Sequence, residues 1–347
     1  MKYQILGRSG LRVSEMCLGA MTFGEEWGLG VDKTESRKVF NAYLDAGGNF
    51  IDTANKYNEG TSETFLGDFM SGMRDRIVLA TKYSMSMNEA DPNGGGNHRK
   101  NLVLSVEASL RRLKTDYIDL YWLHMWDYTT PADEVMRALD DLVRSGKILH
   151  IGSSDTPAWI IAKSNTLAEL KGWTQFTALQ LKYNLLERSI ERDFLEMARE
   201  MNIAVTSWAP LNYGILTGKY SLKDGKLIST DNSKRYTPDQ GGFLDERKQK
   251  ILAKLKEISD RKDIPMAQIA LAWVRSKNVL PIVGAKTEIQ LRENLGYLNI
   301  LLSEIDKSEL DEAGKIDLGF PQDFLHRDNI RQRIFGDTFS KFDNLAL

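Results

Sequence analysis

Three short apolar runs in this sequence each lead into a side chain that can take part in acid–base chemistry. Asp52 ends the first run, Lys82 follows the second and His124 follows the third, with Tyr57 shortly after Asp52. A charged group at the end of a buried strand is costly unless it is paired, so these positions indicate a site. The carboxyl ends of the strands in a parallel barrel meet at one face, and we predict an active site there.

The elements that would position these residues are short apolar runs alternating with longer amphipathic ones, which is typical of repeated βα units. We expect strands near Met16-Leu18, Asn49-Ile51, Ile77-Thr81, Ile118-Leu123, Ile148-Ile151, Leu179-Leu181, Ala204-Ser207 and Leu280-Val283. Amphipathic helices are expected between them. With an N-terminal hairpin, this pattern predicts an α/β fold, a closed (β/α)8 TIM barrel forming a single domain over residues 1–347.

Two regions interrupt the βα pattern. The segment from Asn212 to Gly242, after the seventh strand of the barrel, is too long for a simple connection, so we expect a functional loop over the open face. After Asn299 the sequence predicts one more helix, from Glu304 to Gly314, followed by a polar tail with isolated aromatic residues. We expect the tail, approximately residues 300–347, to form a lid.

The composition restricts the class of partner. The chain has 347 residues, of which 42% are hydrophobic and 27% charged, as in an ordinary globular protein with a large core. A formal net charge of -2 argues against nucleic acid, and the lack of a long apolar segment argues against a membrane span. The single cysteine, Cys17, cannot form an internal disulfide, so we expect a cytoplasmic protein. The oligomeric state is not indicated.

Metal catalysis is the main alternative chemistry for a barrel. The sequence has four histidines, no His-x-His pair and no cluster of carboxylates around a histidine. This pattern argues against a catalytic metal. His98, His150 and His326 lack the sequence context of His124, and we interpret them as ordinary residues.

Further motifs follow in order along the chain. The full series is Asp52-Thr53-Ala54 with Tyr57, Thr81-Lys82, Leu123-His124, Gly152-Ser153-Ser154-Asp155, Gln180, Trp208-Ala209-Pro210-Leu211 and the run from Gly214 to Tyr220. This series resembles the aldo-keto reductase superfamily over nearly the whole chain. Gly284-Ala285-Lys286, with Gln290 and Asn294, is most similar to its aryl-alcohol-dehydrogenase-like and potassium-channel β-subunit branches. The resemblance implies an enzyme that reduces aldehyde or ketone carbonyls to alcohols.

The resemblance also implies roles for Asp52, Tyr57, Lys82 and His124, which we call the tetrad. Tyr57 would donate a proton to the carbonyl oxygen and His124 would orient that carbonyl. Because a free tyrosine has a pKa near about 10, Lys82 would favour the tyrosinate and Asp52 would keep Lys82 charged. Without the resemblance, Asp52 and Lys82 could form a purely structural salt bridge, and His124 could be an ordinary residue of the barrel rim.

A nicotinamide cofactor, NADP(H), is implied in the same way. No Gly-x-Gly-x-x-Gly follows the first strand, which argues against a Rossmann site but not against a dinucleotide. Lys286 favours the 2′-phosphate of NADP, although Glu288 and Glu293 are near it in sequence and a carboxylate would favour NAD. Trp208 would stack on the nicotinamide or, alternatively, pack in the core. The implied cofactor contacts are Thr22, Asp52, Ser154, Asp155, Gln180, Trp208, Pro210, Leu211, Gly214, Gly218, Lys219, Gly284, Lys286, Gln290 and Asn294.

Asp155 stands where most members of the family have asparagine. Its carboxylate could accept a hydrogen bond from the carboxamide NH₂ of the nicotinamide. Alternatively, it could cap a helix that begins near Pro157, since it lies just ahead of a proline. We favour the capping role and expect Ser154 to make most of the carboxamide contacts.

Large side chains follow several strand ends and are candidates for the walls of a substrate pocket: Trp27, Tyr83, Met85, Met125, Trp126 and Tyr128. Such walls suit aryl or long aliphatic carbonyls, and equally a sugar. Our leading hypothesis is therefore an NADP-dependent carbonyl reductase. The alternatives are a cofactor-binding regulatory or redox-sensing subunit, similar to the channel β-subunits, and a barrel hydrolase or isomerase.

Overall fold

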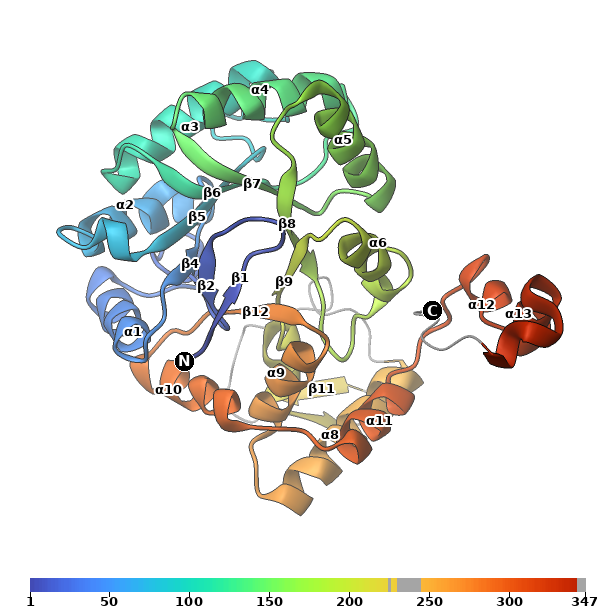
Figure 1. The fold of residues 1–347 in the computed structure, drawn as a ribbon. Helices are drawn as coiled ribbons and strands as arrows, with labels where there is room; N and C mark the ends of the chain where they lie inside the picture. The colour runs from blue at the N-terminus through green and yellow to red at the C-terminus, as the bar shows by residue number, and fades with distance from the viewer. Residues whose placement is uncertain (224–225, 230–244, 342–347) are drawn as a thin grey trace.

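The centre of the computed structural model, which describes residues 1–223, 226–229 and 245–341, is a closed barrel of parallel strands (Figure 1). The strands follow the ring order β12-β3-β4-β5-β6-β7-β8-β9. Their bounds are β3 (Cys17–Gly19), β4 (Phe50–Asp52), β5 (Val78–Tyr83), β6 (Ile118–Leu123), β7 (Ile148–Ser154), β8 (Phe176–Lys182), β9 (Ala204–Trp208) and β12 (Val279–Val283). The predicted (β/α)8 TIM barrel is confirmed, and each expected strand overlaps one of these eight.

Helices surround the barrel (Figure 1). They are α1 (Lys33–Asp45), α2 (Thr61–Phe69), α3 (Arg99–Leu113), α4 (Ala132–Arg144), α5 (Ala158–Lys171), α6 (Phe194–Glu200), α8 (Glu246–Lys262), α9 (Met266–Ser276), α10 (Glu288–Leu295) and α11 (Glu304–Ala313). Local sequence sets several helix starts, because Asp32, Asp245, Thr287 and Ser303 each accept a hydrogen bond from the first turn. Within the described ranges, every helix is too short or too polar to cross a lipid bilayer.

Both faces of the barrel strands are buried, which explains why their sequences are continuous apolar runs. Outward-facing residues such as Leu79 pack against the helices, while inward-facing residues such as Phe50 fill the barrel. The expected hairpin is present as β1 (Tyr3–Ile5) and β2 (Arg12–Ser14). It lies across one end of the barrel (Figure 1), where Leu6 and Val13 join the interior cluster. The opposite, carboxyl end is left for a site.

The register of the barrel places polar strand ends side by side. Asp52 at the end of β4 is level with Ala80 of β5, and Ser154 at the end of β7 is level with Gln180 of β8. Residues far apart in the sequence therefore share the carboxyl face of the barrel.

The segment after β9 begins as the 3-10 turn η4 (Asn212–Thr217). It continues as the antiparallel pair β10 (Tyr220–Lys223) and β11 (Lys226–Ser229). Residues 224–225 and 230–242 of the predicted loop lie outside the described residues. Its position over the open face therefore stays a prediction.

The tail contains the expected helix, α11, and then two more, α12 (Gln322–Leu325) and α13 (Asp328–Phe335). Figure 1 places α12 and α13, in red, beside the barrel and outside the ring of helices. Phe324, Leu325 and Ile334 of this pair are exposed, so few apolar contacts hold it against the barrel, and Gln322 Nε2 donates to Arg192 O at 2.9 Å. These helices do not cover the open face, which corrects the expectation of a lid; residues 342–347 lie outside the described chain.

Candidate active site

The four tetrad side chains meet at the carboxyl ends of β4, β5 and β6. Lys82 Nζ lies 2.5 Å from Asp52 Oδ2, 3.1 Å from the Tyr57 hydroxyl and 2.8 Å from Thr53 O. The His124 ring meets the Tyr57 ring edge to face, with 6.0 Å between the centroids. The residues predicted from separate strand ends are therefore brought together into one group.

Lys82 is the centre of this group, and its side chain has no exposed surface. Burial by itself lowers the pKa of Lys82, but the charges of Asp52 and Tyr57 and the hydrogen bonds to them raise it above its usual value. Lys82 is therefore a cation at neutral pH. Asp52, whose side chain is 3% exposed, is its counter-ion. A buried charge of this kind is tolerated only because it is paired and hydrogen-bonded.

Gln180 holds the second oxygen of Asp52. Its side-chain Nε2 donates to Asp52 Oδ1 at 2.9 Å, which connects β8 with β4 across the barrel. We predicted Gln180 only as a cofactor contact. No local sequence signal could have identified the second contact, because the two residues are 128 positions apart and meet only when the barrel closes.

Tyr57 begins the 3-10 turn η1 (Tyr57–Gly60), which follows β4 after residues 53–56. Burial raises the pKa of its phenol and the charge of Lys82 lowers it, and the net pKa is above the usual 10.0. Lys82 thus acts in the expected direction, but burial is the larger effect. The phenol is protonated throughout the neutral range, which suits a proton donor.

His124 follows β6 and is 8% exposed. Burial, and then the charge of Lys82, lower the pKa of His124 well below 6.5, so the imidazole is neutral at neutral pH. A neutral imidazole has one N–H donor. Among the described residues, His124 Nδ1 has no hydrogen-bond partner. The ring can therefore donate a single hydrogen bond to a ligand oxygen without bringing a second positive charge into the site.

Asn58 and Glu59, which were not identified from the sequence, follow Tyr57 and hold Trp27 beside it. Asn58 Oδ1 accepts a hydrogen bond from the Trp27 backbone N–H, and Glu59 Oε1 accepts one from the indole N–H, both at 3.1 Å. The Trp27 and Tyr57 rings meet edge to face at 6.0 Å. The turn composition of Asn58-Glu59-Gly60 is the signal that could have identified this contact.

Of the residues expected to form the pocket walls, five are partly or largely exposed and one, Tyr83, is buried. Trp27 lies against Tyr57, and Trp126 is partly exposed, with its backbone N–H donating to Asp155 O at 3.3 Å. Met125 and Tyr128 are exposed on the same loop. Met85, also partly exposed, lies on the loop after β5.

Tyr83 does not line the open face and corrects our expectation. It is fully buried, its hydroxyl donates to Asn97 O at 3.3 Å, and its ring stacks on Tyr121 with centroids 5.5 Å apart. Successive side chains of a strand point to opposite faces. Because Lys82 points into the barrel, Tyr83 points outward into the layer between the strands and the helices.

Asp155 contacts Trp208 instead of capping a helix. The Trp208 indole Nε1 donates to Asp155 Oδ1 at 3.0 Å. The N-cap of α5 is Pro157, with no side-chain cap, so the favoured capping role is wrong. Asp155 adopts a left-handed φ of 36°, which the chain tolerates at a short polar residue. Burial raises the pKa of its carboxyl, and the Trp208 hydrogen bond lowers it in part.

Further predicted cofactor contacts lie on the loop after β9. Pro210 is buried and Leu211 is partly exposed. Gly214 and Gly218 have φ values of 92° and 81°, which an L side chain rarely adopts, so these positions depend on glycine. Lys219 is exposed. Their contact with a cofactor stays a prediction.

The last predicted contacts surround the end of β12. Thr22 Oγ1 donates to Ala285 O at 3.0 Å, and Gln290 Oε1 accepts from Lys286 N at 3.0 Å. Thr22 and Gln290 therefore shape the turn that carries Lys286 into α10. The other two predicted residues here, both partly exposed, are Gly284 and Asn294.

Residues 1–223, 226–229 and 245–341 contain no group of three or more His, Cys, Asp or Glu side chains placed to hold a metal ion.

A closed parallel barrel with a buried Asp52–Lys82 pair bonded to Tyr57, and a neutral His124 at its carboxyl face, has the form of an enzyme that transfers protons to a bound ligand. The model of the Aldo/keto reductase family matches residues 15–315, which is most of the chain. This protein therefore belongs to the aldo/keto reductase family.

Curated relatives extend over nearly the same length. A norsolorinic acid reductase of Aspergillus flavus is 40% identical over 337 residues, covering 93% of this chain and 84% of the relative. An aldo-keto reductase, ausK, of Emericella nidulans is 36% identical with the same coverage. A putative aryl-alcohol dehydrogenase, AAD14, of Saccharomyces cerevisiae is 35% identical, covering 92% of this chain and 88% of the relative. These relationships support carbonyl reduction as the activity.

Proposed function

We propose that this protein is an NADP(H)-dependent reductase of aldehyde or ketone carbonyls. The observation that carries the proposal is the connected group of Lys82, Asp52 and Tyr57 with His124 at its edge. Reduction of a carbonyl places negative charge on its oxygen, which requires a proton and fixed hydrogen-bond donors. The tetrad supplies both, from three strand ends and the turn that follows β4.

Tyr57 would give its proton to the carbonyl oxygen. The Lys82 ammonium, 3.1 Å from the phenol oxygen, is already in place to stabilise the phenolate that forms. Asp52 and Thr53 O fix the ammonium, so little rearrangement accompanies the proton transfer. His124 would donate its one N–H to the same carbonyl oxygen and orient it toward Tyr57.

The residues at the ends of β7 and β8 fit a nicotinamide carboxamide, which presents one acceptor and one NH₂ donor group. Gln180 uses its NH₂ on Asp52, which leaves its side-chain carbonyl as an acceptor, and the Ser154 hydroxyl is a donor at the neighbouring strand end. Ser154 would donate to the carboxamide and Gln180 would accept from it. Trp208 would stack on the ring. The bound cofactor would supply the hydride.

The surroundings of Lys286 support NADP over NAD. Lys286 immediately precedes Thr287, the N-cap of α10, and a cation beside a helix N-terminus attracts phosphate. The carboxylate nearest in sequence, Glu288, is paired with Arg292 of the same helix at 2.7 Å. Glu288 is therefore directed along α10, which is not the arrangement expected of a carboxylate that binds a ribose 2′-hydroxyl.

For the substrate we propose an aryl ketone or aldehyde. Trp27 stands beside the proton donor, and Trp126, Met125 and Tyr128 follow the strand that carries His124. Flat apolar side chains of this kind suit an aromatic ring. The names of two relatives, norsolorinic acid reductase and putative aryl-alcohol dehydrogenase, accord with such a substrate class.

The test is consumption of NADPH and NADH against aryl aldehydes, aryl ketones, α-dicarbonyls, quinones and keto-sugars, with Tyr57→Phe as the inactive control. We expect turnover of the aryl carbonyls with NADPH. Failure to bind either dinucleotide would refute the proposal. Tight NADPH binding without turnover of any carbonyl would instead favour a regulatory subunit.

A further inference from the structure

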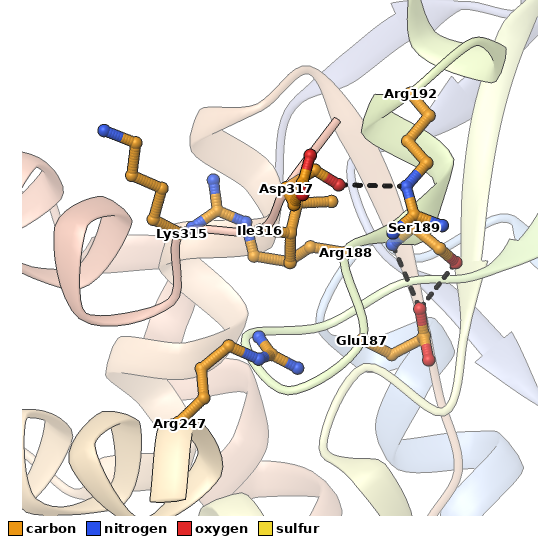
Figure 2. Close-up of a pocket in the computed structure, with 8 residues that line it drawn as sticks. All are labelled: Glu187, Arg188, Ser189, Arg192, Arg247, Lys315, Ile316 and Asp317. Carbon is orange, nitrogen blue, oxygen red and sulfur yellow. Dashed lines mark hydrogen bonds between the residues drawn. The ribbon is translucent and has the colours of Figure 1, made fainter. Parts of the chain in front are cut away.

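A polar pocket away from the tetrad opens where the barrel meets the root of the C-terminal tail (Figure 2). Its volume is about 420 Å³, which is within the range of small-molecule sites. The lining comes from the segment after β8, the first turn of α8 and the segment after α11: Glu187, Arg188, Ser189, Arg192, Arg247, Lys315, Ile316 and Asp317. None of these residues belongs to the tetrad or to the predicted cofactor contacts.

Arg247 is held in this pocket by backbone carbonyl groups. Its Nη2 donates to Leu186 O at 2.8 Å and its Nη1 to Gly314 O at 3.2 Å. Carbonyl oxygens satisfy N–H groups but carry no net charge, so they leave the positive charge uncompensated. A guanidinium has five N–H donors, and these two bonds use only part of them. Arg247 thus presents an oriented cation to the pocket.

Arg192, like Arg247, is bonded to a backbone carbonyl group. Its Nε donates to Asp317 O at 3.2 Å, a backbone contact that Figure 2 shows as a dashed line. Within the described residues, neither Arg192 nor Arg247 forms an ion pair with a carboxylate. Lys315 is 74% exposed at its side chain and lies 3.9 Å from Glu312, which is a weak surface pair. The long lysine can therefore turn to a ligand at little cost.

Arg188 differs because it is already neutralised. It is 7% exposed, and its Nε and Nη2 donate to the two oxygens of Glu191 at 2.8 and 2.9 Å. Its Nη1 donates to Asp311 O, at the end of α11. Arg188 therefore joins α11 to the barrel and forms a rigid wall.

Two carboxylates also line the pocket. Glu187 Oε1 accepts from the Ser189 N–H and hydroxyl at 3.0 and 2.6 Å, and Asp317 Oδ1 accepts from Gly319 N at 2.7 Å. The second oxygen of Glu187 keeps lone pairs that can accept from a ligand hydroxyl, whereas the Asp317 carboxyl also hydrogen-bonds with the Asp323 side chain. The pocket therefore combines cations that match an anionic group with acceptors that match hydroxyl groups, and Ile316 is its one apolar lining residue.

We propose that this pocket binds the phosphate ester of a small polyol. Arg192, Arg247 and Lys315 would contact the phosphate, because guanidinium groups match phosphate oxygens in geometry and charge. Glu187 would accept from the hydroxyl groups. The ligand would connect the segment after β8, α8 and the root of the tail, and so would stabilise the folded protein.

The experiment is calorimetric titration of the full chain with glycerol 3-phosphate, inorganic phosphate and glycerol at one ionic strength, repeated with saturating NADPH. We expect glycerol 3-phosphate to bind more tightly than inorganic phosphate, glycerol to bind undetectably, and NADPH to leave the ester affinity unchanged. Arg192→Gln, which removes the charge of an exposed residue, should weaken the ester by about ten- to a hundredfold. Glu187→Gln should reduce the preference for the ester over inorganic phosphate.

The matched control is Lys256→Gln, an exposed lysine of α8 that is paired with Asp260 and is absent from the pocket. It should leave the affinity unchanged, and melting curves should show all variants folded. Equal affinity in wild type and Arg192→Gln, or the absence of saturable binding in the millimolar range, would overturn the proposal. Competition by NADPH would overturn it too, since the ester would then occupy the cofactor site.

Discussion

The two sides of the barrel's carboxyl face position their polar groups in different ways. On the side of β4, β5 and β6, ionisable groups are buried and bonded to one another, as Lys82 is to Asp52 and Tyr57. On the side of β7, β8, β9 and β12, Ser154 and Gln180 are buried at strand ends, but other predicted contacts, such as Asp155 and Lys286, are more exposed and lie beside loops. We infer that the first side is organised before any ligand arrives and that the second is completed by the cofactor.

The largest expected effect is on the buried side. Tyr57→Phe removes the proton donor and leaves the predicted cofactor contacts intact, so carbonyl reduction should fall by about 10²–10⁴-fold with NADPH affinity nearly unchanged. Steady-state kinetics and fluorescence titration measure the two quantities. Tyr3→Phe, at an exposed position of the hairpin at the opposite end of the barrel, is the control. If the variant kept more than about a tenth of the wild-type kcat, Tyr57 would not be the acid.

Lys82→Met tests whether the buried side is a single unit. Activity should fall as far as in Tyr57→Phe, and stability should also fall, by about 3–5 kcal/mol, because Asp52 is left as a buried charge without its cation. Chemical denaturation measures the loss. Asp52→Asn in the same chain should recover part of the stability but no activity. An unchanged free energy of unfolding in Lys82→Met would show that Asp52 does not depend on Lys82 for its charge to be tolerated.

On the cofactor side, Lys286→Ala should act on affinity alone. NADPH should bind about one to two decades more weakly, since a charge-assisted contact with a phosphate contributes about 1.5–3 kcal/mol. NADH lacks the 2′-phosphate and should be little affected. Fluorescence titrations of both cofactors measure the difference, and Arg292→Ala, further along α10, is the comparison variant. Equal losses for NADPH and NADH would place Lys286 away from the phosphate.

Asp155 should show a smaller effect. Asp155→Asn keeps an acceptor for the Trp208 indole and should be mild, whereas Asp155→Ala removes the acceptor and should weaken cofactor binding by about 1 kcal/mol, or roughly fivefold. Cofactor titration and melting curves distinguish this from a helix-capping role, which would lower stability instead. In a Trp208→Phe background the two Asp155 variants should become equivalent. A persistent difference there would mean that Asp155 acts through another group.

The smallest expected effect is that of pH. The pKa of His124 lies well below 6.5, so the imidazole stays neutral above that value, and the pKa of Tyr57 lies above 10.0, so the phenol stays protonated below it. The rate of carbonyl reduction should therefore be flat between these two pH values. A pH profile of kcat/KM measures this. An inflection near 6.5 that disappears in His124→Asn would contradict the neutral imidazole.

The barrel, and the positions of three tetrad residues at its carboxyl face, could be predicted from the sequence because both depend on local pattern. Buried parallel strands are continuous apolar runs, and a charged residue where such a run ends has to lie at the carboxyl face. Asp52, Lys82 and His124 could therefore be placed from their neighbours in the chain. Many of the predicted cofactor contacts lie on loops, where no apolar run marks them. They could therefore be recognised only by resemblance to a family.

Tertiary structure decided the contacts between residues that are distant in the sequence. Asp155 bonds to Trp208, 53 positions away, and Gln180 bonds to Asp52, 128 positions away. Local composition favoured a capping role for Asp155, but the barrel register brings the ends of β7, β8 and β9 together, and the indole N–H is satisfied there. Alternation along β5 likewise turned Tyr83 away from the face that Lys82 occupies. Such outcomes depend on which strands become neighbours, and neighbouring strands are chosen only when the barrel closes.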